Sequence, residues 1–130
     1  MPAQKRILVI DDDPSMLDVF YILLGEKYQV TIKEYVRDMI KTVAENAPDL
    51  IILDKILGFA DGCQLCTTIK QHKTYSKIPV IMISVHNNSG DACIKAGAAE
   101  FIEKPFTVTA MMERIAHYLN PDAILKNEFL

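Results

Sequence analysis

The chain has 130 residues, of which 50% are hydrophobic and 24% charged, and its formal net charge at pH 7 is −3. This length suits one domain with its own core, and this hydrophobicity excludes a disordered chain. The acidic balance argues against a domain that binds nucleic acid by itself, and the sequence has neither a signal-peptide pattern nor a membrane-spanning apolar run, so we expect a cytoplasmic protein without membrane contact.

The first predicted strand ends in three adjacent carboxylates. Residues 6–10 contain a continuous apolar run, which is typical of a strand buried on both faces. Pro14 suits the first turn of a helix with Asp13 as its N-cap, and this helix is expected to end near Gly25. The three carboxylates belong to Asp11, Asp12 and Asp13. Because like charges repel, the run is either a solvated loop or a site for something positive.

Strands and helices alternate along the rest of the chain. Further strands are expected at 30–34, 50–53, 79–83 and 101–102, and further helices at 36–46, 62–72, 91–96 and from Thr107 to about 120. Residues 87–90 are expected to form a loop. Such alternation predicts an α/β fold with a parallel sheet, right-handed crossovers and helices on both faces.

Polar side chains follow the predicted strands at the points where these strands end. Asp54, Ser84 and Lys104 come after three later strands, so they join the aspartates at one edge of the sheet. Carboxylates held together favour a divalent cation, and a site made only of oxygen atoms favours Mg²⁺. With a lysine and a hydroxyl, this set could stabilise a phosphoryl group, and a carboxylate could be its nucleophile.

The three cysteines leave a second chemistry open. Cys63 and Cys66 form a C-x-x-C pair, which raises a redox or a zinc hypothesis, but no second pair completes a four-ligand zinc site. An odd number of cysteines argues against a disulfide framework, and Cys93 stands alone. We therefore expect Cys63 and Cys66 to be ordinary helix residues.

Two known families use the carboxylate, hydroxyl and lysine set. Asp11-Asp12-Asp13 fits the D-x-D motif of haloacid-dehalogenase-type phosphatases, in which Asp11 would be the nucleophile and Asp13 the acid and base. Ser84 and Lys104 fit the next two motifs of that family. The pair of acidic residues expected after the lysine is missing, and the chain has no room for a cap domain.

From residue 5 to about 120, the chain more closely resembles the response-regulator receiver domain of two-component signalling, of the chemotaxis-response-regulator type. The matching motifs are "ILVIDDDPSM", "PDLIILDKIL" followed by "DG", "IPVIMIS" and "AGAAEFIEKPF". The resemblance implies a doubly wound, flavodoxin-like sheet with strand order 2-1-3-4-5. We expect a receiver domain at 1–120, and a tail or the start of a linker at 121–130.

The resemblance also assigns roles to the residues at the strand ends. It implies that Asp54 is the phosphoacceptor and that Ser84 and Lys104 contact the phosphoryl group. Phe101 occupies the aromatic switch position, with an ordinary core residue of the strand as an equal alternative, and a cis peptide bond is expected between Lys104 and Pro105. The implied Mg²⁺ ligands are Asp12, Asp54, the backbone carbonyl of Ile56 and, through a water molecule, Asp11.

The implied function is regulatory rather than enzymatic. A histidine kinase or a histidine phosphotransfer protein would donate the phosphoryl group to Asp54, and a second copy of the chain is a further candidate partner. The alternative is a degenerate receiver that is never phosphorylated and acts as an interaction or dimerisation module. Intact acidic, hydroxyl and lysine positions favour the phosphorylated form.

Several positions depart from the pattern of the resembled family. Gly58 replaces a usual proline, which predicts a looser loop after Asp54, and Val85 replaces a usual small residue, which predicts narrower access. The short spacing between Ser84 and Gly97 predicts a short or partly unwound fourth helix. In this family, the second residue after the acceptor and the second after the hydroxyl flank the path of attacking water. These are Ile56 and His86.

Overall fold

The computed structural model describes residues 3–120, which form one parallel sheet of five strands in the order β2-β1-β3-β4-β5. The strands are β1 (Arg6–Ile10), β2 (Gln29–Lys33), β3 (Leu50–Asp54), β4 (Val80–Ser84) and β5 (Glu100–Glu103). The predicted fold class and strand order are confirmed. The predicted tail at 121–130 lies outside the described residues.

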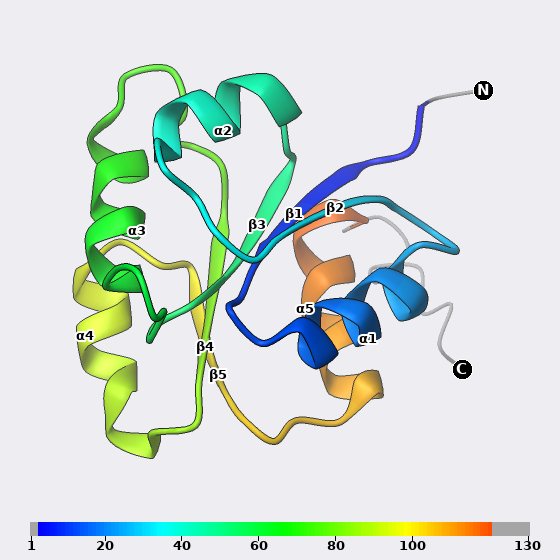
Figure 1. Cartoon of the computed structure of the whole chain (residues 1–130). Helices are drawn as coiled ribbons and strands as arrows, with labels where there is room; N and C mark the ends of the chain where they lie inside the picture. Colours follow the sequence, from blue (N-terminus) through cyan, green and yellow to red (C-terminus); the bar gives the residue numbers. More distant parts are fainter. Residues whose placement is uncertain (1–2, 121–130) are drawn as a thin grey trace.

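Helices cover both faces of this sheet (Figure 1). They are α1 (Pro14–Leu24), α2 (Met39–Asn46), α3 (Gly62–Gln71), α4 (Gly90–Lys95) and α5 (Val108–Leu119). Side chains of α1 and α5 pack with one set of alternating β1 residues, Ile7 and Val9. Side chains of α2, α3 and α4 pack with the other set, Leu8 and Ile10. The two cores together fix the central strands, whose carboxyl ends carry the candidate site.

Side-chain caps determine where the helices begin. The Asp13 carboxylate accepts a hydrogen bond from the Ser15 N–H at 3.0 Å, which confirms its predicted role as the N-cap of α1. Asp38 accepts from the Lys41 N–H at 3.1 Å, so α2 begins at Met39. The predicted start at residue 36 was therefore wrong, because the sequence pattern did not show which residue caps the helix.

The segment between β4 and β5 is short, as predicted. Residues Asn87–Ser89 form a 3₁₀ turn, where a loop was expected, and α4 follows with only six residues. Gly97 has a φ of +105°, a left-handed conformation that glycine adopts without a steric penalty. Each end of each strand differs from its predicted position by at most one residue.

The three cysteines are free thiols that lie in the hydrophobic core or pack against it. Cys66 and Cys93 are buried, and burial raises their pKa values to about 11 and about 12. Thiols with such high pKa values are poor metal ligands and poor nucleophiles near neutral pH. The only group of potential metal ligands found within residues 3–120 is made of aspartates, so the structure favours the expectation of ordinary helix residues. Within the same residues, no helix is both long and apolar enough to span a bilayer.

Candidate functional site

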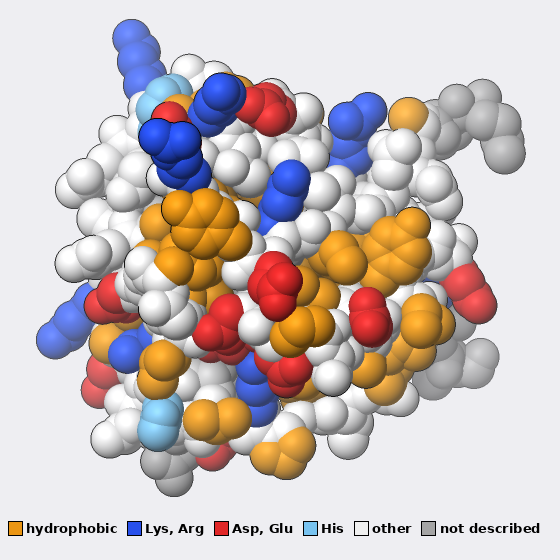
Figure 2. Space-filling view, in the orientation of Figure 1, with side chains coloured by type: hydrophobic (Ala, Val, Ile, Leu, Met, Phe, Trp, Pro, Cys, Tyr) orange, Lys and Arg blue, Asp and Glu red, His pale blue; other side chains and the backbone are white. Residues whose placement is uncertain are grey.

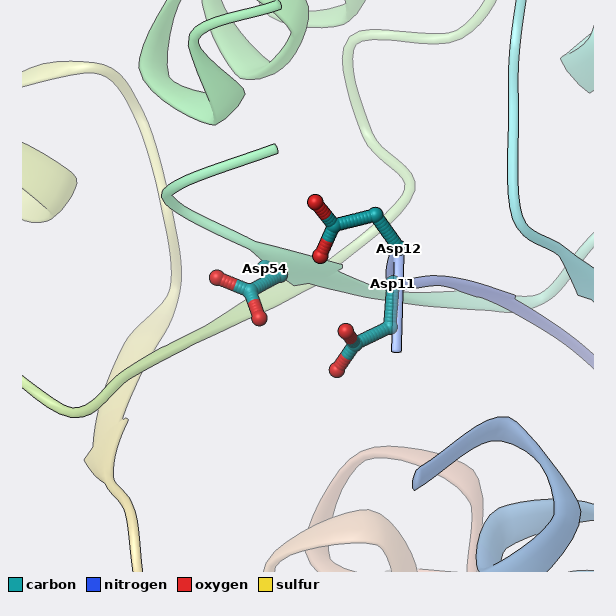
Figure 3. A group of neighbouring side chains, drawn as sticks. All are labelled: Asp11, Asp12 and Asp54. Atoms are coloured by element: carbon teal, nitrogen blue, oxygen red, sulfur yellow. The ribbon is translucent and has the colours of Figure 1, made fainter. Parts of the chain in front are cut away.

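Three aspartates meet at the carboxyl edge of the sheet. Asp11 and Asp12 follow β1, and Asp54 ends the neighbouring strand β3, with Ile10 and Leu53 in register. One carboxylate oxygen of each aspartate lies within 4.8 Å of the others (Figure 3). Asp13 is not a member of this group, because it caps α1 instead.

A single lysine reaches the two buried carboxylates of the cluster. The Nζ atom of Lys104 lies 2.7 Å from Asp54 Oδ2 and 3.0 Å from Asp11 Oδ2. The side chains of Asp11 and Asp54 are 1% and 9% exposed, and that of Lys104 is 12% exposed. Burial alone would lower the pKa of Lys104, but its hydrogen bonds to Asp54 and Asp11 raise it above the usual value.

Negative charge is in excess at this site. The cluster has three carboxylates and one ammonium group, that of Lys104, in contact with two of them. Burial raises the pKa of Asp11, with repulsion from Asp54 as a smaller contribution. A divalent cation would relieve that repulsion. The ligand set contains oxygen atoms only and includes two carboxylates that are already desolvated, which fits Mg²⁺ better than a transition metal.

Backbone N–H groups hold each carboxylate in place. The Ile56 N–H donates to Asp54 Oδ1 at 2.9 Å, and the Asp13 N–H donates to Asp11 Oδ1 at 3.0 Å. The Gly58 N–H donates to Asp12 Oδ2 at 2.7 Å. The glycine N–H thus makes a contact that a proline at this position could not make, while the predicted loosening of the loop stays a prediction.

Ser84, the predicted hydroxyl residue, lies beside Asp54, the predicted phosphoacceptor. Asp54 pairs with Ile83 across β3 and β4, so Ser84 is one residue further along the neighbouring strand. Ser84 is buried, and its Oγ accepts a hydrogen bond from the His86 N–H at 3.2 Å. The Lys104 N–H donates to the Ser84 carbonyl at 2.8 Å, which ties the hydroxyl and lysine positions together.

The remaining predicted site residues lie around this edge. Val85 and His86 are exposed, as is Ile56, at 50%. Phe101 is half-buried, and its ring lies 3.3 Å from the position that a β-carbon would take on Gly90, at the start of α4. The peptide bond between Lys104 and Pro105 is cis, as expected.

A doubly wound parallel sheet with clustered aspartates and a lysine at its carboxyl edge is the arrangement expected of a signalling receiver domain. The model of the response regulator receiver domain family matches residues 7–116. The chain therefore belongs to the response regulator receiver domain family. This membership sets aside the haloacid-dehalogenase-type alternative. Receiver domains bind Mg²⁺ at an acidic pocket, and the three aspartates form an acidic cluster here.

Similar proteins are found among DNA-binding regulators. The chain is 33% identical over 135 residues to the DNA-binding dual master transcriptional regulator RpaA of Synechocystis, covering 96% of this chain and 55% of RpaA. It is 29% identical to the DNA-binding response regulator MtrA of Mycolicibacterium smegmatis, covering 86% of this chain and 49% of MtrA. The chain thus spans about half the length of these relatives.

Solved structures share the whole fold. A putative response regulator from Chloroflexus aurantiacus superimposes with a TM-score of 0.83 and 26% identity, covering 90% of this chain and 98% of that one. A CheY-like receiver domain protein from Methanospirillum hungatei gives a TM-score of 0.81 and 27% identity, covering 92% and 96%. The family and the fold are therefore supported independently by sequence and by structure.

Proposed function

We propose that Asp54 accepts a phosphoryl group from a histidine kinase or a histidine phosphotransfer protein, in a Mg²⁺-dependent step that switches a signalling output. The observation that carries this proposal is the position of Lys104. A buried ammonium group 2.7 Å from one buried carboxylate and 3.0 Å from another is placed to stabilise negative charge that arrives at Asp54.

The proposed transfer is a simple displacement. A carboxylate oxygen of Asp54 forms a bond to phosphorus, the bond between phosphorus and the donor histidine nitrogen breaks, and that nitrogen keeps the electron pair. Asp54 loses its own negative charge when its oxygen bonds to phosphorus, while the phosphoryl group brings up to two negative charges. Lys104 is therefore expected to leave Asp54 for a phosphoryl oxygen, and the Ser84 hydroxyl is placed to donate a hydrogen bond to another.

Mg²⁺ would be held by Asp12, Asp54 and the Ile56 backbone carbonyl, with Asp11 acting through a water molecule. The ion would offset the charge of the phosphoryl oxygens. Phe101, packed beside Gly90, is the residue through which the phosphoryl group would shift α4 between two positions.

The surface around the cluster suits a protein donor. Figure 2 shows acidic side chains near the middle of this face with hydrophobic side chains on both sides. On α1, Val19 is 45% exposed and Leu23 37%, and both line an apolar cavity of about 150 Å³ between α1 and the start of α5. A helix-bearing protein could bury these side chains while it presents its phosphohistidine to Asp54.

Loading from a small phosphodonor tests the proposal directly. The full chain is incubated with acetyl phosphate, with and without Mg²⁺, and its intact mass is measured over time. We expect one phosphoryl group per chain, and only with Mg²⁺. A chain that gains no mass in the presence of Mg²⁺ would instead support the alternative of a non-phosphorylated interaction module.

Substitution of neighbouring aspartates should separate the metal ligand from the helix cap. Asp12→Ala is expected to weaken Mg²⁺ binding, measured by calorimetry, far more than Asp13→Ala does. Asp13→Ala should instead lower the free energy of unfolding by about 1 kcal/mol, through loss of the cap on α1. Equal losses of Mg²⁺ affinity in the two variants would show that the aspartates have been assigned wrongly.

The exposed side chain of Ile56 should prolong the life of the phosphorylated state. Ile56 cannot position a water molecule by hydrogen bonding, whereas asparagine can, so Ile56→Asn is expected to lose the phosphoryl group faster than the wild type. Decay is followed by intact mass after donor removal, at fixed pH and Mg²⁺. Decay in the variant that is no faster than in the wild type would refute this shielding role.

Val85→Ala provides the companion measurement, on the rate of loading. Removing bulk beside Ser84 should speed phosphorylation by acetyl phosphate if Val85 narrows the approach to Asp54. An unchanged loading rate would show that this exposed side chain leaves the approach open. The thermal stability of both variants should stay close to that of the wild type, since both side chains are exposed.

A further inference from the structure

We propose that the backbone N–H of Gly58 is a positioning group for Asp12, which holds one carboxylate oxygen so that the other faces the metal site. The inference rests on the proposed Mg²⁺-dependent function and names a residue that the resemblance does not assign. It predicts that this N–H strengthens Mg²⁺ binding although it would not touch the ion.

Asp12 is the least constrained member of the acidic cluster. Asp11 and Asp54 are buried, and each is held by a backbone N–H and by Lys104. The Asp12 side chain is exposed. Within residues 3–120, its carboxylate has one hydrogen-bond donor, the Gly58 N–H, at 2.7 Å from Oδ2. An exposed aspartate without that bond would be free to rotate away from the site.

The two oxygens of Asp12 point in different directions. In Figure 3, one oxygen is turned toward Asp11 and Asp54, and the other is turned away from them. The bond from the Gly58 N–H to Oδ2 restricts the rotation of the carboxylate, and we take the other oxygen, Oδ1, as the one presented to the metal. Such partners, which orient a metal ligand without touching the metal, contribute substantially to affinity.

The loop that carries the donor is held at two points. It is closed at its base by the Gly62 N–H, which donates to the Lys55 carbonyl at 2.7 Å. Beside Gly58, the ring of Phe59 packs edge-on against Tyr35, with ring centroids 5.0 Å apart. The loop is therefore held at its base and by the residue next to the donor. Position 58 usually holds proline in the resembled family, and proline has no N–H to donate.

Two substitutions at Gly58 separate the N–H from the loop. Gly58→Pro removes the donor, whereas Gly58→Ala keeps it and adds a β-carbon 3.2 Å from Asp12 Oδ2, a tight contact that the exposed carboxylate can relieve by a small shift. Mg²⁺ affinity is measured by calorimetry on the full chain. We expect Gly58→Pro to weaken binding by about tenfold, the lower end of the range for outer-shell partners, and Gly58→Ala by much less.

The outcomes distinguish this inference from the proposed function. If the wild type and Gly58→Pro bind Mg²⁺ equally well, or if the variant binds more tightly, the positioning role is overturned while metal binding stands. If the wild type does not bind Mg²⁺, the proposed function itself fails, and this role with it.

A second measurement needs neither Mg²⁺ nor a change in the loop. The Gly58 amide is observed by ¹H–¹⁵N NMR in the wild type, in Asp12→Ala and in the matched control Asp13→Ala. Loss of the acceptor should move the Gly58 amide proton upfield and speed its exchange with solvent in Asp12→Ala, but not in the control. A Gly58 amide that is the same in all three proteins would overturn the contact, even if Gly58→Pro fails to fold.

Discussion

Asp54→Asn is expected to abolish phosphorylation by acetyl phosphate while the protein stays folded. Asparagine has nearly the same shape, but its amide lacks the nucleophilic carboxylate oxygen. Both oxygens of Asp54 accept hydrogen bonds, from the Ile56 N–H and from Lys104, and asparagine offers only one acceptor. One of the two bonds is therefore lost, at a cost of about 2 kcal/mol in stability because the acceptor is a charged group, whereas the loss of phosphorylation should be complete.

The matched control is Asp13→Asn, which makes the same chemical change two residues from Asp11. Asparagine caps helices about as well as aspartate, so this variant should keep both its stability and its phosphorylation. Both variants are incubated with acetyl phosphate and Mg²⁺, and intact mass is followed together with urea unfolding. An Asp54→Asn protein that gains one phosphoryl group at the wild-type rate would disprove the assignment of the acceptor.

The sequence was sufficient to predict the fold because the apolar runs, the helix cap and the alternation of strands and helices all indicated the same arrangement. The buried run at 6–10 with an aspartate and a proline after it predicted β1, the N-cap Asp13 and the start of α1, and the structure has all three. Alternation of strands and helices predicted the parallel sheet, whereas the strand order came from the family resemblance. Residues at four strand ends were predicted to meet. The side chain of Lys104 contacts Asp11 and Asp54, and its backbone N–H contacts the Ser84 carbonyl, so all four ends do.

Contacts made by the backbone could not be predicted in the same way. The start of α2 depends on which residue caps it, and the periodicity of residues 36–46 did not distinguish Asp38 from its neighbours. The Gly58 N–H was missed because a glycine in a loop indicates conformational freedom, not a hydrogen bond to a particular side chain. The signal that could have revealed it was the absence of the usual proline, since this substitution adds a donor as well as flexibility.

Removal of the lysine at this site should have the largest effect on stability. Lys104→Met keeps a long, unbranched side chain but leaves Asp11 and Asp54 without the ammonium group that pairs with both. Removing one partner of a buried ion pair leaves the other charge buried without compensation. We therefore expect the free energy of unfolding to fall by about 3 kcal/mol at neutral pH without Mg²⁺. Added Mg²⁺ should restore part of this loss, because the ion binds the same carboxylates in the folded state only.

The pH dependence of the stability of this variant distinguishes loss of the lysine charge from a packing defect. Burial raises the pKa of Asp11 above its usual value, and removal of Lys104 should raise it further. A carboxyl group with a raised pKa in the folded state binds more protons folded than unfolded, so it favours folding as pH falls toward its unfolded pKa. The stability difference between wild type and Lys104→Met should therefore shrink between neutral pH and about pH 5.

Urea unfolding at several pH values measures this stability difference, with substitution of an exposed lysine, Lys77→Met, as the control. A difference that stays constant across this range would show that Lys104 acts through packing and not through its charge.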